Sequence, residues 1–253
     1  MGHGKAPRNL AKSTYCDHNL PVEFDCICVL SVGMEPLVET VILLHGTGRS
    51  PRSLASLEKR LARSGFPTCN LAYPWRERDI AGLASFVADA LEAKGLTGPT
   101  NRLHFVTHSM GGLVVAYLLG KQRDRLAAEI GRVVMLGPPL GGSEVADALC
   151  RLPVYRWMYG PAGQDLVTNS RLLDNIYPDY SLGIIAGTVG WPYPSGLMFI
   201  REPNDGRVSV ARTRWDGMAD HLVLPVTHSF MPASPDVQAQ VLHFLKMGAF
   251  RRS

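Results

Sequence analysis

Short apolar runs recur along the chain and end at Gly, Pro or His residues. Each run is continuous rather than alternating, which is typical of parallel strands that helices cover on both faces. We expect such strands at 41–44, 68–72, 103–107, 131–136, 182–187 and 222–226.

Between these runs, apolar residues recur at helical spacing. This pattern predicts amphipathic helices at 54–62, 80–91 and 237–245. Residues 113–119 are apolar on every face, as in a helix buried against a sheet, and Gly120 is expected to cap its end. A polar helical end is expected at 123–130. Strands that alternate with helices at this spacing predict an α/β fold, with a mainly parallel central sheet and helices on both faces.

The alternation breaks at residues 143–180, where aromatic and apolar residues cluster. This segment forms either core helices or a small cap whose aromatic side chains face an apolar ligand. A second apolar insertion, rich in proline, lies at 191–194. We expect most of these side chains to belong to the core and a minority to line a substrate pocket.

The chain shows no internal repeat, linker or low-complexity segment, so a single domain is the economical prediction. Residues 39–248 are expected to form this α/β domain, with any cap at 143–180. Residues 1–38 are expected to form an N-terminal extension that lacks clear periodicity, apart from one candidate strand at 24–32.

The composition excludes several classes of protein. The formal net charge of +4 is modest, and the basic residues form no stripe with interleaved aromatics, so no nucleic-acid partner is expected. No apolar run has the length of about 20 residues that a transmembrane helix needs. Five cysteines, an odd number, indicate reduced thiols rather than a disulfide framework, and no metal site is expected.

One N-terminal segment resembles a secretory signal, because basic residues precede an apolar stretch. Asp17, Glu23 and Asp25 interrupt it where the apolar core should build, and no clean cleavage site follows. This slightly favours a cytoplasmic location. The oligomeric state stays open.

One stretch predicts chemistry, namely Thr107-His108-Ser109-Met110-Gly111 between an apolar strand and an apolar helix. The spacing Thr107-x-Ser109-x-Gly111 matches the nucleophile elbow G-x-S-x-G, with Thr in place of the first Gly. Such an elbow exposes the serine hydroxyl at a tight turn, and the start of the next helix offers unpaired N–H groups to an oxyanion. The bulkier Thr107 predicts a slightly opened turn.

Four polar residues follow the predicted strands: His45, Ser109, Asp205 and His228. The carboxyl ends of parallel strands share one edge of the sheet, so these side chains can meet there. A serine needs a base to take its proton, and the base needs an acid to fix its tautomer. His228 follows the last strand and is the best candidate base, and Asp205 is the best candidate acid.

Two other carboxylates compete with Asp205 for this role, namely Glu144 and Asp147 after the strand that ends at 136. The remaining histidines fit the role of base less well. His108 would point away from Ser109, and His104 would lie buried or at the strand edge. His221 would precede the last strand.

Together, His45-Gly46-Thr47-Gly48, the Ser109 elbow, Asn204-Asp205-Gly206 and the late His228 resemble an α/β-hydrolase-fold serine hydrolase. The similarity is strongest to small bacterial lipases and esterases and to lipase-like deacylases, over about residues 38–248. The resemblance implies a triad of Ser109, Asp205 and His228. It also implies an oxyanion hole from the backbone N–H groups of Thr47 and Met110, on a loop that His45 and Gly46 support.

The resemblance further implies hydrolysis of a small-molecule or lipid ester without a metal or organic cofactor. Two other functions stay open. An acyltransferase or thioesterase would use the same triad, since only the access of water separates these reactions. A non-catalytic ligand-binding protein would keep the fold without the reaction.

Overall fold

The six expected strands pair into one sheet, and every neighbouring pair is parallel. The computed structural model describes Met1 and residues 37–252, and its strand order is β2-β1-β3-β4-β5-β6. The strands are β1 (Val38–Leu44), β2 (Thr68–Leu71), β3 (Asn101–His108), β4 (Glu129–Leu136), β5 (Ser181–Gly187) and β6 (Asp220–Leu224). The candidate strand at 24–32, and almost all of the expected extension at 1–38, lie outside the described residues.

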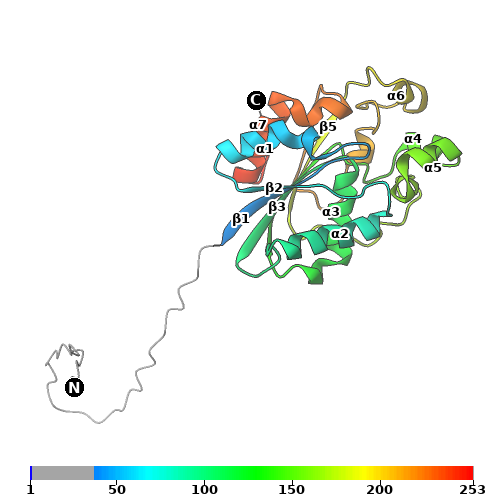
Figure 1. Ribbon diagram of the computed structural model, residues 1–253. Helices are drawn as coiled ribbons and strands as arrows, with labels where there is room; N and C mark the ends of the chain where they lie inside the picture. Colours follow the sequence, from blue (N-terminus) through cyan, green and yellow to red (C-terminus); the bar gives the residue numbers. More distant parts are fainter. Residues whose placement is uncertain (2–36, 253) are drawn as a thin grey trace, which may run out of the picture. The chain divides into compact units, whose positions relative to one another are not determined.

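Helices cover both faces of the sheet, as the sequence predicts. They are α1 (Ala55–Arg63), α2 (Ile80–Ala93), α3 (Met110–Lys121), α4 (Glu144–Leu149), α5 (Pro153–Tyr159), α6 (Pro194–Phe199) and α7 (Pro235–Met247). Figure 1 shows α1 and α7 on one face and α2 and α3 on the other. Within residues 37–252, no helix has both the length and the apolar character needed to cross a membrane.

The side chains of the sheet alternate between two hydrophobic cores. Ile42, Leu44 and Phe105 pack with the helices α2 and α3, whereas Val41 and Leu43 pack with α1 and α7. Because the central strands are buried on both faces, their sequences are continuous apolar runs. This double burial holds β3 in the middle of the sheet, and the Ser109 turn follows its end.

Local signals fix the helix ends. Asp79 caps α2 by accepting the N–H of Gly82 at 2.8 Å. Ser234 precedes Pro235 at the start of α7, and Gly248 ends that helix in the left-handed region at φ 76°. These ends anchor the helices that flank the carboxyl edge of the sheet.

Several boundaries differ from the sequence-based expectations, and three of them change how a residue is interpreted. Gly120 does not cap α3, which continues to Lys121; a Cβ at this position would lie 2.3 Å from Ile176, so the glycine makes room for that side chain. The expected helical end at 123–130 is a short 3-10 helix, η2 (Arg123–Arg125), followed by β4. The last strand starts at Asp220, so His221 lies within β6 rather than before it.

The segment 143–180 contains α4, α5 and the 3-10 helix η3 (Pro161–Gln164). Tyr155 is buried and Ala162 joins the core of the domain, whereas Leu152, Val154 and Trp157 are exposed. The insertion at 191–194 leads into the short helix α6. The segment therefore contributes both to the core and to the surface above the sheet.

Candidate active site

Ser109 stands at a sharp turn between β3 and α3. Its backbone has φ 54° and ψ −126°, a conformation that non-glycine residues rarely adopt. The N–H of Ser109 donates to the carbonyl of Leu136 at 2.8 Å, which ties the turn to β4. Such strain persists only where the surrounding structure fixes it, so the fold holds this hydroxyl in one position.

The turn is tight enough to require two glycines. A Cβ on Gly111 would lie 2.7 Å from the carbonyl oxygen of Leu44, and one on Gly46 would lie 2.9 Å from the Cβ of Ser109. The side chain of Thr107, at the position where the elbow pattern has glycine, is fully buried and has its Oγ1 near Gly112. A Cβ on Gly112 would lie 2.8 Å from the Cβ of Pro138, so this glycine leaves room for the proline after β4.

His228 follows β6 at the start of the 3-10 helix η5 (His228–Ala233). Its Nε2 lies 2.9 Å from Ser109 Oγ, although the two residues are 119 positions apart. The imidazole is almost completely buried. The hydroxyl and the imidazole are thus within the distance that proton transfer requires.

The second ring nitrogen of His228 meets a buried carboxylate. Asp205 Oδ2 lies 2.7 Å from His228 Nδ1, and the side chain of Asp205 has no exposed surface. An ionised carboxylate only accepts hydrogen bonds, so this contact holds a proton on Nδ1. Nε2 is then free to accept the hydroxyl proton of Ser109.

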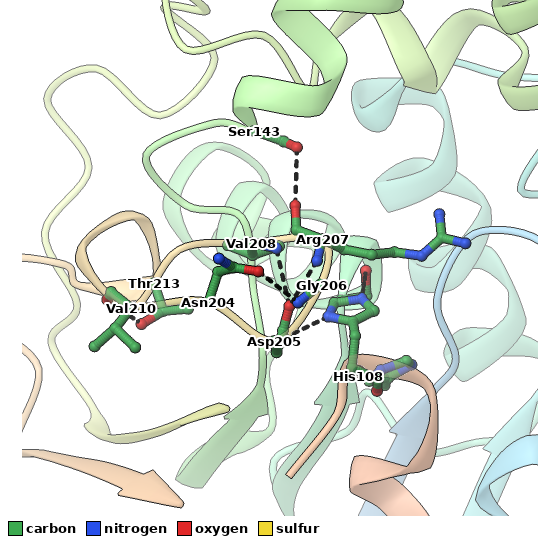
Figure 2. Close-up of polar contacts among 11 residues, drawn as sticks. His108, Ser143, Asn204, Asp205, Gly206, Arg207, Val208, Val210 and Thr213 are labelled. Carbon is green, nitrogen blue, oxygen red and sulfur yellow. Dashed lines mark hydrogen bonds and ion pairs between the residues drawn. The ribbon is translucent and has the colours of Figure 1, made fainter. Parts of the chain in front are cut away.

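A compact turn presents Asp205, and Figure 2 shows its contacts. The other oxygen of the carboxylate, Oδ1, accepts the N–H groups of Arg207 at 3.0 Å and Val208 at 2.9 Å. Asn204 Oδ1 accepts the N–H of Gly206 at 2.9 Å, and an antiparallel bridge between Asn204 and Ser209 closes the turn. These backbone donors fix the direction of the carboxylate.

Gly137 follows β4 at φ 55° and has a role that its sequence context does not reveal. A Cβ here would lie 3.0 Å from Asp205 Oδ2 and 3.1 Å from His228 Nδ1. This glycine therefore leaves room for the contact between the carboxylate and the imidazole. The Gly-Pro-Pro stop after the strand is the only signal for it in the sequence.

The competing carboxylates point elsewhere. Glu144 accepts the hydroxyl of Ser209 at 3.0 Å and lies 3.5 Å from Arg212. Asp147 accepts both the N–H and the hydroxyl of Thr168. Among the candidate carboxylates, Asp205 alone contacts His228.

The other histidines have structural partners. His45 stacks on the ring of Tyr73, with centroids 4.5 Å apart, and the hydroxyl of Tyr73 donates to the carbonyl of His45. His104 is buried and accepts the N–H of Arg132 at 2.9 Å. Burial lowers the pKa of both imidazoles below the usual value near 6.5. These contacts hold His45 against Tyr73, and its support of the loop of Thr47 stays a prediction.

Thr47 and Met110, which are expected to supply the two oxyanion donors, contact each other. The hydroxyl of Thr47 donates to Met110 Sδ at 3.3 Å. Met110 is the first residue of α3, where a backbone N–H has no intrahelical partner. Both residues belong to turns that border Ser109, and their role as donors stays a prediction.

A cavity of about 260 Å³ opens over Ser109 and His228. Helices α4 and α5 supply Val145, Ala146, Tyr155 and Met158 to its wall, so a minority of the apolar side chains in 143–180 line it, as expected. The insertion at 191–194 does not contribute. Arg49 and Arg207 also line the cavity, which sequence analysis did not predict.

The described residues offer no metal ligands in a group, because no three His, Cys, Asp or Glu side chains gather as a metal site would need. Cys69 and Cys150 are unpaired thiols, and the other three cysteines lie outside the described residues.

The sequence profile of the Alpha/beta hydrolase family matches residues 41–247, which is most of the chain. The protein belongs to this family. The parallel sheet, the helices on both faces and the serine turn after β3 agree with that membership. No curated protein matches the chain.

Solved structures with the same fold include a lipase, a thioesterase and a phospholipase, each at low sequence identity. The lipase BlEst2 of Bacillus licheniformis in propeptide form aligns with a TM-score of 0.66 and 18% identity over 87% of this chain and 52% of that one, so this chain spans about half its length. The thioesterase RedJ of Streptomyces coelicolor aligns at 0.57 and 18%, over 84% and 88%. The phospholipase PlaB of Legionella pneumophila aligns at 0.62 and 15%, over 84% and 60%.

Proposed function

We propose that this protein is a serine hydrolase that cleaves carboxylic esters through an acyl-enzyme. The observation that carries the proposal is the continuous chain of contacts from Ser109 Oγ to His228 Nε2 at 2.9 Å and from His228 Nδ1 to Asp205 Oδ2 at 2.7 Å. Family membership supports a hydrolase, and the finer assignment to esters rests on this geometry.

In the proposed reaction, His228 takes the proton of Ser109 as Oγ attacks the acyl carbonyl. The oxyanion forms beside the backbone N–H groups of Thr47 and Met110, which offer preorganised dipoles. The C–O bond then breaks, and the leaving alcohol receives the proton from His228. A water molecule, deprotonated by His228, releases the acid and restores Ser109.

Asp205 remains ionised throughout this sequence. It is buried, two backbone N–H groups donate to its Oδ1, and its Oδ2 faces the imidazolium that forms in each step. The carboxylate therefore stabilises the positive charge on His228 without taking its proton. A non-catalytic ligand-binding protein would need neither this buried carboxylate nor the aligned imidazole.

Labelling with a fluorophosphonate probe, combined with turnover of p-nitrophenyl esters, tests the proposal. The wild-type protein is expected to label at Ser109 and to hydrolyse short-chain or medium-chain esters. Ser109→Ala should abolish labelling and lower kcat/KM by about a thousandfold or more. Ser64→Ala, whose hydroxyl donates to the carbonyl of Arg60, is the matched control and should leave both readouts unchanged.

Asp205→Asn separates the role of the acid from that of the serine. The Asn side chain keeps an oxygen that can accept the two backbone N–H groups. Its amide group, however, turns an N–H toward His228 Nδ1, so the imidazole either faces a second donor or adopts the tautomer with its proton on Nε2. We expect kcat to fall by about 10²- to 10⁴-fold with labelling slowed rather than lost.

Undiminished turnover in folded Ser109→Ala would contradict the proposed function.

A further inference from the structure

The space around Ser109 has two parts with different chemistry. The first is the cavity of about 260 Å³, whose wall from α4 and α5 is apolar. The second is an adjoining open cavity of about 530 Å³ that Arg49, Ser50, Arg52 and Ser53 line. Gly48, Arg49 and Trp75 line both cavities, so the two cavities adjoin at these residues.

Positive charge in this space has no acidic counterpart. Three arginines line the two cavities, Arg49, Arg52 and Arg207, and no Asp or Glu does. Among the described residues, neither Arg49 nor Arg52 forms an ion pair, whereas Arg102 and Arg125 each pair with carboxylates elsewhere on the surface. The arginines at the cavity are therefore available to an anionic ligand.

Arg207 is held in place without a carboxylate. Its guanidinium donates to the hydroxyl of Tyr159 at 2.9 Å and lies 5.1 Å from the centre of the Tyr193 ring. Figure 2 shows its side chain extending away from the carboxylate of Asp205. The charge of Arg207 thus faces the cavity wall near Tyr159 and does not neutralise the acid of the site.

Arg49 lines the same cavity as the reacting serine. The wall of that cavity also includes His108, Ser109 and His228. A negative group bound by Arg49 would therefore occupy the cavity that holds the reacting hydroxyl.

We propose that the natural substrate is an acyl ester or thioester whose leaving group carries phosphate, with the acyl chain in the apolar part and the phosphate on Arg49 and Arg52. This inference rests on the proposed function. Guanidinium groups bind phosphate oxygens through paired, charge-assisted hydrogen bonds. Arg49 and Arg52 are three residues apart, form no ion pair and line the open cavity that adjoins the cavity of Ser109. They match such a group.

The reaction itself stays that of a serine hydrolase. Ser109 Oγ bonds to the acyl carbon, the C–O or C–S bond breaks, and the phosphate-bearing alkoxide or thiolate takes the proton that His228 received from Ser109. Water then releases the acid. Arg49 and Arg52 bind the leaving group and exchange no proton.

Two sources could supply such a leaving group, a phosphorylated glycerol or coenzyme A, and matched substrate pairs separate them. One pair is 1-octanoyl-lysophosphatidic acid against 1-octanoylglycerol. The other is octanoyl-4′-phosphopantetheine, the phosphate-bearing arm of coenzyme A, against octanoyl-pantetheine. Within each pair the acyl group and the reacting bond are the same, so a difference in kcat/KM reports the phosphate alone.

We expect the phosphate-bearing member of at least one pair to have a kcat/KM about tenfold higher, and this preference to shrink as salt rises to about 0.5 M. Arg49→Gln with Arg52→Gln should lower the ratio of the two kcat/KM values by about tenfold, mainly through KM. Lys59→Gln with Arg63→Gln removes the same charge from exposed positions on α1 and should leave the ratio unchanged.

The outcomes distinguish this inference from the proposed function. In one outcome the neutral esters are hydrolysed and Ser109 is labelled, but both ratios of kcat/KM stay near one or are unchanged by the Arg49 and Arg52 substitutions. The phosphate assignment is then wrong, whereas the proposed hydrolase function stands. If the folded protein neither labels nor hydrolyses any of the four substrates, the proposed function fails and this inference fails with it.

Discussion

The imidazole of His108 lies directly against that of His228, with ring centroids 4.9 Å apart. His108 Nε2 is 2.9 Å from the backbone carbonyl oxygen of His228. Because a carbonyl only accepts, the proton of His108 must lie on Nε2. Burial, together with the charge of His228, lowers the pKa of His108 well below its usual value, so the ring is neutral and serves as a fixed donor.

His108 is therefore a positioning residue for His228. His108→Ala should lower kcat by about tenfold and the free energy of unfolding by about 1–3 kcal/mol, because a buried carbonyl loses its donor and a cavity forms. His108→Gln, whose amide can donate, should recover part of both losses. Steady-state kinetics and urea unfolding measure the two effects, and a kcat equal to that of the wild type in His108→Ala would contradict the role.

Gly46→Ala is expected to damage activity from a position that touches no substrate. The added Cβ would lie 2.9 Å from Ser109 Cβ and 3.1 Å from His108 Nδ1, so the loop that carries Thr47 must move. A displacement of about 1 Å at a reacting group costs on the order of a hundredfold in rate.

The control for this prediction is Gly98→Ala, whose Cβ would meet only Asn101 Nδ2 at 3.7 Å. This variant should keep its activity and its thermal midpoint. Fluorophosphonate labelling rates compare the two variants, and equal rates would show that the loop near Ser109 absorbs the extra atom.

Thr107→Val should stabilise the protein. Thr107 Oγ1 is buried and has no hydrogen-bond partner among the described residues, so its hydroxyl is desolvated without compensation. Val has nearly the same shape, and we expect the free energy of unfolding to rise by about 1 kcal/mol with activity unchanged. Thr213→Val is the control, because its hydroxyl donates to the carbonyl of Val210 at 2.7 Å; it should destabilise. A loss of stability in Thr107→Val would contradict the prediction.

Acid should destabilise the protein in part through His221. Burial, followed by the charge of Arg214, lowers the pKa of His221 to about 4 in the folded state, against about 6.5 when unfolded. The unfolded state therefore binds a proton first, and stability is full above pH 6.5 and falls as the pH drops from 6.5 toward 4. The charges of Asp220 and Arg252 also act on this ring.

The measurement is urea unfolding at pH 7.5 and pH 5. Because the ring is partly exposed, solvent screening reduces its contribution to about 1 kcal/mol over this interval. His221→Gln should flatten the pH dependence by that amount, since Gln does not titrate. An unchanged slope in this variant would show that His221 takes up its proton equally easily in both states.

The sequence could predict the centre of the fold better than its borders. The central strands are buried on both faces, so continuous apolar runs locate them. The edge strand β6 is only partly buried and its first residues are polar, so the apolar run that marks it in the sequence begins two residues after its start at Asp220. Gly120 is indistinguishable in sequence from a helix cap, because the contact with Ile176 that requires it comes from a distant loop.

The residues proposed for catalysis could be found because they are polar side chains after strands. Ser109, Asp205 and His228 each follow an apolar run or its connecting turn, and the structure brings them together. The support that His108 gives to His228 depends on the direction of one imidazole ring, which sequence spacing does not determine. The sequence likewise does not show that Arg49, Arg52 and Arg207 line cavities without acidic side chains, because only folding brings these residues together.

The position of the strands along the chain has a consequence for the proposed reaction. The turn of Ser109 is held by β3 and β4, whereas His228 follows β6 and lies beside Asp205 at the end of the sheet that β5 and β6 complete. A chain that had assembled only its first four strands would carry the serine without its proposed base. Under the proposed function, such an intermediate would be inert toward esters until the last third of the polypeptide had folded.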